Sequence, residues 1–254
     1  MITYAIGVLL AAIQLPSRDS LLAEGVRLAA MQPAVALVRF DALLALDSTD
    51  VNVNWHAAIA LSDLAEPLRA PADRARRDSL LARAESVARR AVRLAPSNAR
   101  ALFALGLVLG NTALTRGLKD RVRLAVEIRE LALRALAADS LLDGAHHLLG
   151  RWNYEVMRLS GFERFIARTI LGGGVLREAS WSEAEQELQR AVALDSSRIY
   201  HRLDLARVQL ARKDWAAAHT QLRAIAALPV RVAADSVYRR EAGRLLEKLK
   251  PRQE

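Results

Sequence analysis

Histidine is the first residue type to consider for chemistry in this sequence, because cysteine is absent. Without cysteine the chain has no disulfide, no thiolate nucleophile and no Cys-ligated zinc site. The histidines are His56, His146, His147, His201 and His219. No two of them are four residues apart, the spacing that places two metal ligands on one face of a helix. The sequence therefore predicts no metal site.

No arrangement of polar residues matches a known catalytic motif. HExxH, GxSxG, GxGxxG and Walker-type sequences are absent. Gly172-Gly173-Gly174 lacks the Lys-Ser/Thr that follows a phosphate-binding loop, so these glycines indicate a hinge. The acidic residues are scattered and form no carboxylate pair suited to acid–base work. We therefore predict no catalytic residue, no bound cofactor and no enzymatic activity.

Aromatic and arginine side chains are the remaining candidates for a functional site, and the function they suit is binding. The residues concerned are Trp55, Asn111, His147, Arg151, Tyr154, Arg158 and Arg207. Arginine binds carboxylates through paired N–H groups and aromatic rings supply contact area, so this mixture suits recognition of a peptide or its carboxylate. For Trp55, packing inside the protein core is an equally good interpretation. Whether these residues share one surface depends on the elements that carry them.

The hydrophobic periodicity is helical through almost the whole chain, and strand-like alternation is absent. Of the 254 residues 52% are hydrophobic, 26% charged and 5% aromatic, which together with the dominance of Ala, Leu and Arg predicts an all-α fold. The predicted helix pairs are 19–31 with 33–46, 51–66 with 73–95, 98–115 with 120–138, 141–159 with 180–194, and 198–211 with 214–228. A last helix is predicted over 234–249.

Polar residues that could cap these helices stand before several of them. Ser180 followed by Glu183 has the spacing of a capping box, in which each side chain accepts a hydrogen bond from the other residue's N–H. Asp50, Ser97, Ser140, Ser196 and Asp214 are predicted to begin other helices.

Three blocks of the sequence align with one another without gaps. In each, an Arg-Ala-apolar triplet ends one helix, and fourteen residues after its Ala comes a Leu followed by Gly or Ala. These pairs are Leu105-Gly106, Leu149-Gly150 and Leu205-Ala206, and a weaker copy runs from Leu43 to Ala57-Ala58. The small residues let two helices approach closely, and the short turn makes the helices antiparallel neighbours. The pattern is similar to the tetratricopeptide repeat, with residues 198–230 as its best copy.

The resemblance to tetratricopeptide repeats implies a solenoid in which the first helix of each pair lines a concave face. The helical register then places the following residues on that face: Trp55, Ile59, Phe103, Leu107, Asn111, His147, Arg151, Tyr154, Arg158, Tyr200, Leu203 and Arg207. We therefore expect a non-catalytic scaffold over 17–250 that binds a peptide or partner protein in its concave groove.

The repeats are irregularly spaced: a longer second helix around 120–138 fits the first excess in length, and an insertion at 160–178 fits the second. The insertion and its flanks carry the most specific sequence. Residues 149–156 read LGRWNYEV, residues 159–164 read LSGFER, and residues 179–184 read ASWSEA. This succession closely resembles the tetratricopeptide-like family called regulator of microtubule dynamics, over about 85–250. The resemblance implies the same helical fold and, from the animal members, an association with microtubules, spindle poles and mitochondria. The Arg-rich, Lys-poor composition favours a bacterial relative.

The insertion itself reads as a short amphipathic helix. Phe162, Phe165, Ile166, Ile170 and Leu171 fall on one face, and Glu163, Arg164 and Arg168 fall on the other. Two interpretations remain open at this point. The insertion is either a lid over the solenoid's own apolar surface or a helix that docks on a membrane surface or partner.

The formal net charge of +9 gives a second functional hypothesis. A basic protein of this kind can bind an anionic lipid surface or nucleic acid peripherally. The interleaving of basic with acidic residues fits ordinary solvated helix faces equally well, so no specific nucleic-acid site is predicted.

The N-terminal residues 1–16 include an apolar run from Tyr4 to Ile13, the length of a signal-peptide core and too short to span a bilayer. No basic residue precedes it. We expect an exported, periplasmic protein if this run is a signal peptide, and a cytoplasmic one if it is an apolar helix that packs on the next. No other segment has the length of a transmembrane helix.

Overall fold

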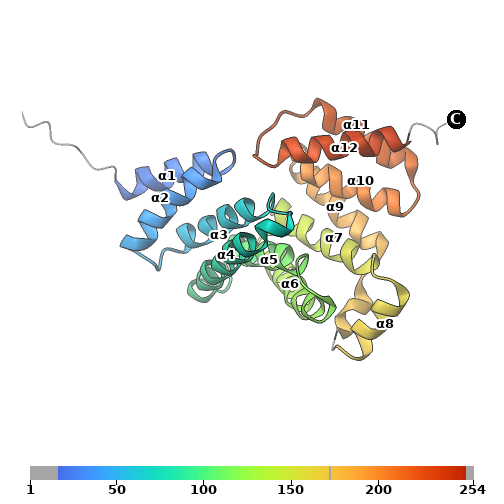
Figure 1. Cartoon of the computed structure of the whole chain (residues 1–254), viewed down its shortest axis with the longest axis horizontal. Coiled ribbons are helices and arrows are strands. Elements are labelled where there is room, and N and C mark those ends of the chain that lie inside the picture. The colour runs from blue at the N-terminus through green and yellow to red at the C-terminus, as the bar shows by residue number, and fades with distance from the viewer. Residues whose placement is uncertain (1–16, 172, 250–254) are drawn as a thin grey trace, which may run out of the picture.

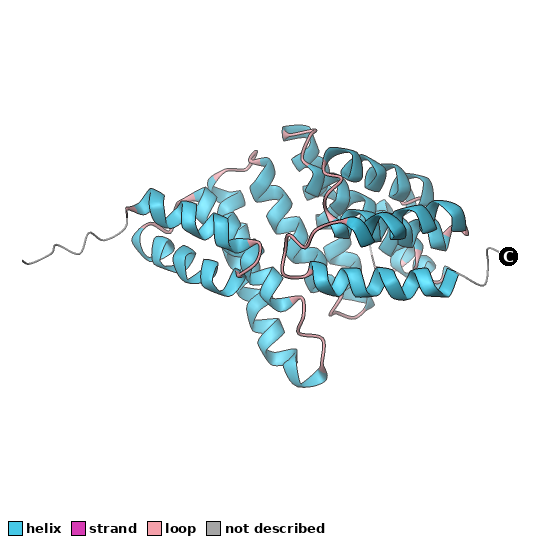
Figure 2. Ribbon diagram, turned by 90° about the horizontal axis from the view of Figure 1, so that it is seen from above, coloured by secondary structure: helices cyan, strands magenta, loops and turns pink. Residues whose placement is uncertain are grey.

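The computed structural model describes residues 17–171 and 173–249, and within them every regular element is helical (Figures 1 and 2). The apolar run predicted within 1–16 lies outside the described residues. The α-helices are α1 (Arg18–Ala29), α2 (Pro33–Leu46), α3 (Val51–Ala65), α4 (Arg74–Leu94), α5 (Ala99–Ala113), α6 (Leu118–Ala138), α7 (Asp143–Met157), α8 (Gly161–Thr169), α9 (Trp181–Leu194), α10 (Ile199–Ala211), α11 (Trp215–Ala227) and α12 (Asp235–Leu249). Two short 3₁₀ helices, η1 (Pro71–Asp73) and η2 (Gly174–Glu178), complete them.

The helix pairs predicted from the sequence are confirmed. Helices α1 and α2, α3 and α4, α5 and α6, α7 and α9, and α10 and α11 pack against each other as consecutive antiparallel pairs, and α12 packs on α11 and α10. The insertion becomes α8 and η2, between the two helices of the fourth pair. One hydrophobic cluster runs through the molecule from α2 to Ala179, and a second joins α10, α11 and α12.

The small residues of the repeated pattern stand where helices touch. A Cβ on Gly150 would lie 2.7 Å from Leu188 Cγ of α9, the partner within the same pair. A Cβ on Gly106 would lie 2.5 Å from Leu148 Cδ2 of α7, the first helix of the next pair. The glycines therefore set close approach both within a pair and between pairs.

The predicted caps are only partly right. Asp50, Ser180 and Asp214 accept N–H groups as expected, but the capping box at Ser180 is incomplete, because the Ser180 N–H donates to Asn153 Oδ1 at 3.0 Å. Asn98 rather than Ser97 caps α5. The predictions for Ser140 and Ser196 are wrong, because α7 and α10 begin after Leu142 and Arg198 without a side-chain cap.

An aspartate explains why those two serines are not caps. Asp139 accepts the N–H of Leu141 at 3.0 Å, and Asp195 accepts the N–H of Ser197 at the same distance. Asp47 binds the N–H of Thr49 in the same way at 2.8 Å. Each serine is thus the middle residue of a turn held by the preceding aspartate, and this turn recurs between repeats.

The two ends of the solenoid meet. The segment between α11 and α12 crosses to the turn between α1 and α2, where the N–H of Ala233 donates to the carbonyl of Ala30 at 2.9 Å. The Tyr238 hydroxyl of α12 donates to the Glu66 carboxylate at the end of α3. Figure 1 shows the result, an arc of helices whose C-terminal arm turns back over the opening toward its N-terminal arm.

A candidate binding cleft

The inner side of the arc encloses a cleft of about 330 Å³. As predicted for a solenoid, its walls come mainly from the first helix of each pair, here α3, α5, α7 and α10. Most of the surface is apolar and includes Ile59, Phe103, Leu107, Leu148 and Leu203. Val232 and Ala233 of the closing segment border the same cleft. The closure therefore turns an open concave groove into a bounded apolar site.

One wall of the cleft is charged and is centred on Asp204, which is buried. Arg207 binds this carboxylate and also binds Glu241 Oε1 at 2.5 Å. The Arg151 guanidinium lies 3.6 Å from Asp204 Oδ2. Burial opposes the ionised form of Asp204, but Arg151, His147 and Arg207 together hold its pKa far below the ordinary value. The wall therefore carries an ionised carboxylate between two arginines.

Behind Asp204, two histidines join α7 to α10. His147 Nε2 lies 3.2 Å from Asp204 Oδ2, His147 Nδ1 lies 3.0 Å from His201 Nδ1, and His201 Nε2 lies 2.8 Å from Asp143 Oδ2. All three contacts are hydrogen bonds only when the two rings together carry three protons, one more than two neutral imidazoles hold. Burial lowers the pKa of His147 to about 4, so this ring is neutral at pH 7.

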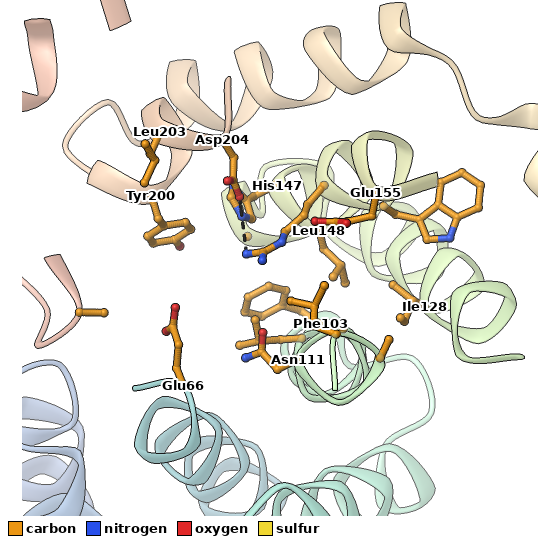
Figure 3. A pocket seen from close by; sticks show the side chains of 18 of the residues that line it. Glu66, Phe103, Asn111, Ile128, His147, Leu148, Glu155, Tyr200, Leu203 and Asp204 are labelled. Carbon is orange, nitrogen blue, oxygen red and sulfur yellow. Dashed lines mark ion pairs between the residues drawn. The ribbon is translucent and has the colours of Figure 1, made fainter. Parts of the chain in front are cut away.

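The opposite wall, from α3, is acidic. Figure 3 shows Glu66 rising from this side, facing Tyr200 and Asp204 across the opening. Asp63 lies one helical turn earlier and its side chain is exposed to the solvent of the cleft. Desolvation by the surrounding protein and, to a smaller extent, the negative charge of Glu66 raise the pKa of Asp63 to about 7. Because the side chain is exposed, solvent reduces the size of this shift. The cleft is therefore cationic toward α7 and α10, and anionic toward α3.

Four of the seven residues predicted for the groove border the cleft, namely Asn111, His147, Arg151 and Arg207. Asn111 is held by a 2.8 Å hydrogen bond from its Nδ2 to the Ser62 hydroxyl. The hydrophobic residues expected beside them, Ile59, Phe103, Leu107 and Leu203, border it too, as does Tyr200.

The other three predicted residues lie away from the cleft. Trp55 is only 8% exposed, stacks on His56 and is covered by Arg100. The structure therefore supports packing in the protein core for Trp55, not a place in the groove. Tyr154 packs edge-on against Trp181 of α9, and Arg158 lies over the Tyr154 ring. At about 100° per residue, the cleft-lining residues Gly144, Leu148, Arg151 and Glu155 form one stripe along α7, and Tyr154 and Arg158 lie to one side of that stripe.

Several cleft residues were not predicted from the sequence. Asp204 and Glu66 are single acidic residues in polar helix stretches, and no local pattern distinguishes them from solvated ones. Leu148 follows the same periodicity as the core, so its signal marks burial rather than a site. Among the described residues, no group of three His, Asp or Glu side chains has an arrangement that could hold a metal ion.

The sequence model of the family described as "Regulator of microtubule dynamics protein 1-3" matches residues 30–250 of this chain. The chain belongs to this family. The match includes all the helices from α2 onward and the whole cleft-lining part of α7 and α10. It also includes the α8 insertion, whose sequence first suggested the family.

Solved structures with similar folds are tetratricopeptide proteins. A thermophilic TPR protein from Thermus thermophilus is similar with a TM-score of 0.63 at 17% identity, over 91% of this chain and 100% of that one. PilF of Pseudomonas aeruginosa is similar with a TM-score of 0.53 at 15% identity, over 92% of each chain. At such identities the likeness shows the fold alone. No protein of curated function matches the sequence.

Proposed function

We propose that this protein is a non-catalytic scaffold that binds a short segment of a partner protein in the cleft. The segment would bring an apolar side chain to the Phe103 and Leu107 surface and a carboxylate to Arg151. A tetratricopeptide-like fold supports protein interaction as the general function, and the two-sided charge of the cleft supports this more specific ligand.

The proposal rests on one observation, the unused hydrogen-bond donors of Arg151. Its guanidinium borders the cleft and makes no hydrogen bond with any described residue, because Asp204 at 3.6 Å is beyond hydrogen-bond range. Arg207, by contrast, already binds both Asp204 and Glu241. A guanidinium has five N–H donors in a planar fork that matches a carboxylate, so Arg151 is the donor that a ligand can use.

The acidic wall supports an orientation for the segment. Glu66 and Asp63 would repel a carboxylate placed near α3, whereas backbone N–H groups of a peptide would be tolerated there. The carboxylate therefore belongs at the α7 and α10 wall. The volume of about 330 Å³ is at the lower end for ligand pockets, which favours the end of a chain over a long extended segment.

Selection from a library of peptides with free C-termini tests the proposal. We expect the selected peptides to end in an apolar residue, and Arg151→Gln to weaken their binding by about tenfold to a hundredfold, as expected for a hydrogen bond between charged groups. Arg158→Gln is the matched control, because Arg158 belongs to the same helix region and lies away from the cleft. Binding that is unchanged in Arg151→Gln would exclude the cleft as the site.

The family suggests one partner to include in that comparison, the microtubule. Co-sedimentation with polymerised tubulin would measure it for the wild type and Arg151→Gln. If a microtubule-borne segment is the ligand, we expect the wild type to pellet with the polymer and the variant to stay in the supernatant.

A further inference from the structure

Helix α8 turns its apolar face outward. Phe162, Phe165 and Ile170 are 73%, 61% and 69% exposed, although the sequence pattern places them on the apolar side of the helix. The side that is buried instead carries Ala167, which packs into the main core against α6 and η2. Figure 1 shows α8 at the outer edge of the arc, away from the central opening. The helix is therefore not a lid over the cleft.

The helix is firmly held in this orientation. A complete capping box begins it, with the Ser160 N–H donating to Glu163 Oε2 at 2.8 Å and the Glu163 N–H to the Ser160 hydroxyl at 3.2 Å. Arg164 binds the carbonyl of Met157 at 2.8 Å, so the charged side of α8 faces the end of α7. At the other end, the Gly173 N–H binds the carbonyl of Ala167 at 2.9 Å. The exposed phenylalanines thus belong to a fixed element.

The surface beside these apolar side chains is basic. Helix α8 packs against η2 and α6, and a Cβ on Gly173, beyond the end of α8, would lie 2.8 Å from Val122 Cγ1 near the start of α6. The sequences of 118–123, 161–169 and 174–178 carry six Lys or Arg residues and three Asp or Glu residues. Lys119, Arg123 and Arg177 are exposed. One of the three acids, Glu178, is paired with Arg129, and another, Glu163, is engaged in the capping box.

The small size and the positive charge of this surface together favour a lipid bilayer over a protein as its binding partner. A helix of nine residues is only about 13 Å long, whereas a specific protein interface buries roughly 800 Å² per partner. Two copies of this surface would also bring like charges together. A bilayer requires no complementary shape, and a few apolar side chains can insert into it. Its anionic headgroups can also bind the surrounding Lys and Arg side chains.

We propose that α8 docks on an anionic lipid bilayer. Phe162, Phe165 and Ile170 enter the boundary between headgroups and acyl chains, and the basic residues of α6 and η2 contact the headgroups. Phe162, Phe165 and Ile170 do not line the cleft, although the cleft reaches Arg121 of α6 and Leu176 of η2. The docking does not depend on what the cleft binds. Among the described residues, no helix has both the length and the apolar character needed to cross a membrane.

Flotation with vesicles measures the docking directly. We expect the full chain to float with vesicles of 70% phosphatidylcholine and 30% phosphatidylserine at low salt, and not with pure phosphatidylcholine. The double variant Phe162→Ser/Phe165→Ser should bind at least tenfold more weakly. The control Leu46→Ser/Leu141→Ser removes two equally exposed apolar side chains elsewhere and should bind like the wild type.

The absence of cysteine allows a second, site-specific readout. An environment-sensitive dye on Phe162→Cys should shift to the blue and brighten when the anionic vesicles are added, whereas the same dye on Leu141→Cys should not change. Equal flotation of the wild type and the Phe162/Phe165 variant would overturn the proposal, as would equal dye responses at the two positions. Self-association that the double variant abolishes, without vesicle binding, would identify a second copy as the occupant instead.

Discussion

Single buried histidines give this protein a predictable response to acid. His56 stacks between Trp55 and Phe40, with ring centroids 3.5 and 5.5 Å away. Burial, reinforced by Arg100 and partly offset by Asp50, lowers the pKa of His56 to about 4. His147 has the same value, again mainly through burial. Between about pH 6.5 and pH 4 these two histidines therefore bind more protons in the unfolded chain than in the folded one, so their contribution to stability falls as the pH falls through this window.

The variant His56→Phe should flatten this pH dependence. Phenylalanine keeps the aromatic stacking and removes one titrating group, so the variant should lose on the order of 1–3 kcal/mol less stability than the wild type between pH 7 and pH 4.5. Urea unfolding followed by circular dichroism at several pH values measures this difference. The comparison at pH 8, where both histidines are neutral in folded and unfolded chains, is the reference. Parallel curves for the two proteins would show that His56 is not one of the responsible groups.

At the scale of the helices, contact distance decides which glycines are required. Gly150 belongs to the Leu-(Gly/Ala) pattern, and a Cβ there would meet Leu188 Cγ at 2.7 Å and the carbonyl oxygen of Ala184 at 3.1 Å. Backbone atoms of α9 cannot move aside as a flexible side chain can. Gly243, in the middle of α12, has no heavy atom within 4 Å of such a Cβ among the described residues.

Alanine substitutions at these two positions should have opposite effects on stability. Gly150→Ala forces α7 and α9 apart and should destabilise the protein by about 1–3 kcal/mol. Gly243→Ala adds no clash and improves helix propensity, so it should stabilise by roughly 0.5–1 kcal/mol. Chemical denaturation at pH 7 measures both. A stabilised Gly150→Ala protein would mean that α7 and α9 are not packed as closely as described.

At the scale of the whole molecule, contacts between residues far apart in the chain could not be predicted from sequence patterns. Helix bounds and pairing follow from periodicity and were predicted correctly, because each depends on residues close together in the chain. The closure of the arc depends on Tyr238 and Glu66, which are 172 residues apart, and no local pattern connects them. Similarly, Arg151 and Arg207 look alike in the sequence, and only the fold brings Glu241 to Arg207 and leaves Arg151 without a hydrogen bond to any residue that the structure describes.

Removing the closing hydroxyl tests whether the ends of the arc control access to the cleft. Tyr238→Phe leaves the Glu66 carboxylate without this donor, which should cost about 1–3 kcal/mol if the carboxylate stays buried, or less if it turns to solvent. Both responses loosen the contact between α12 and α3. We therefore expect faster hydrogen exchange at 228–238 and at the turn between α1 and α2, where Ala233 binds Ala30.

Tyr154→Phe is the matched control for this prediction, because it removes a hydroxyl from a tyrosine that packs against Trp181 outside the cleft. Exchange in the two closing segments should stay at the wild-type rate in this variant. A peptide selected for the cleft should also associate faster with Tyr238→Phe than with the wild type, since opening of the arc must precede entry. An unchanged association rate together with faster exchange would show that the ends of the arc separate without limiting access, and that ligands enter the cleft from another side.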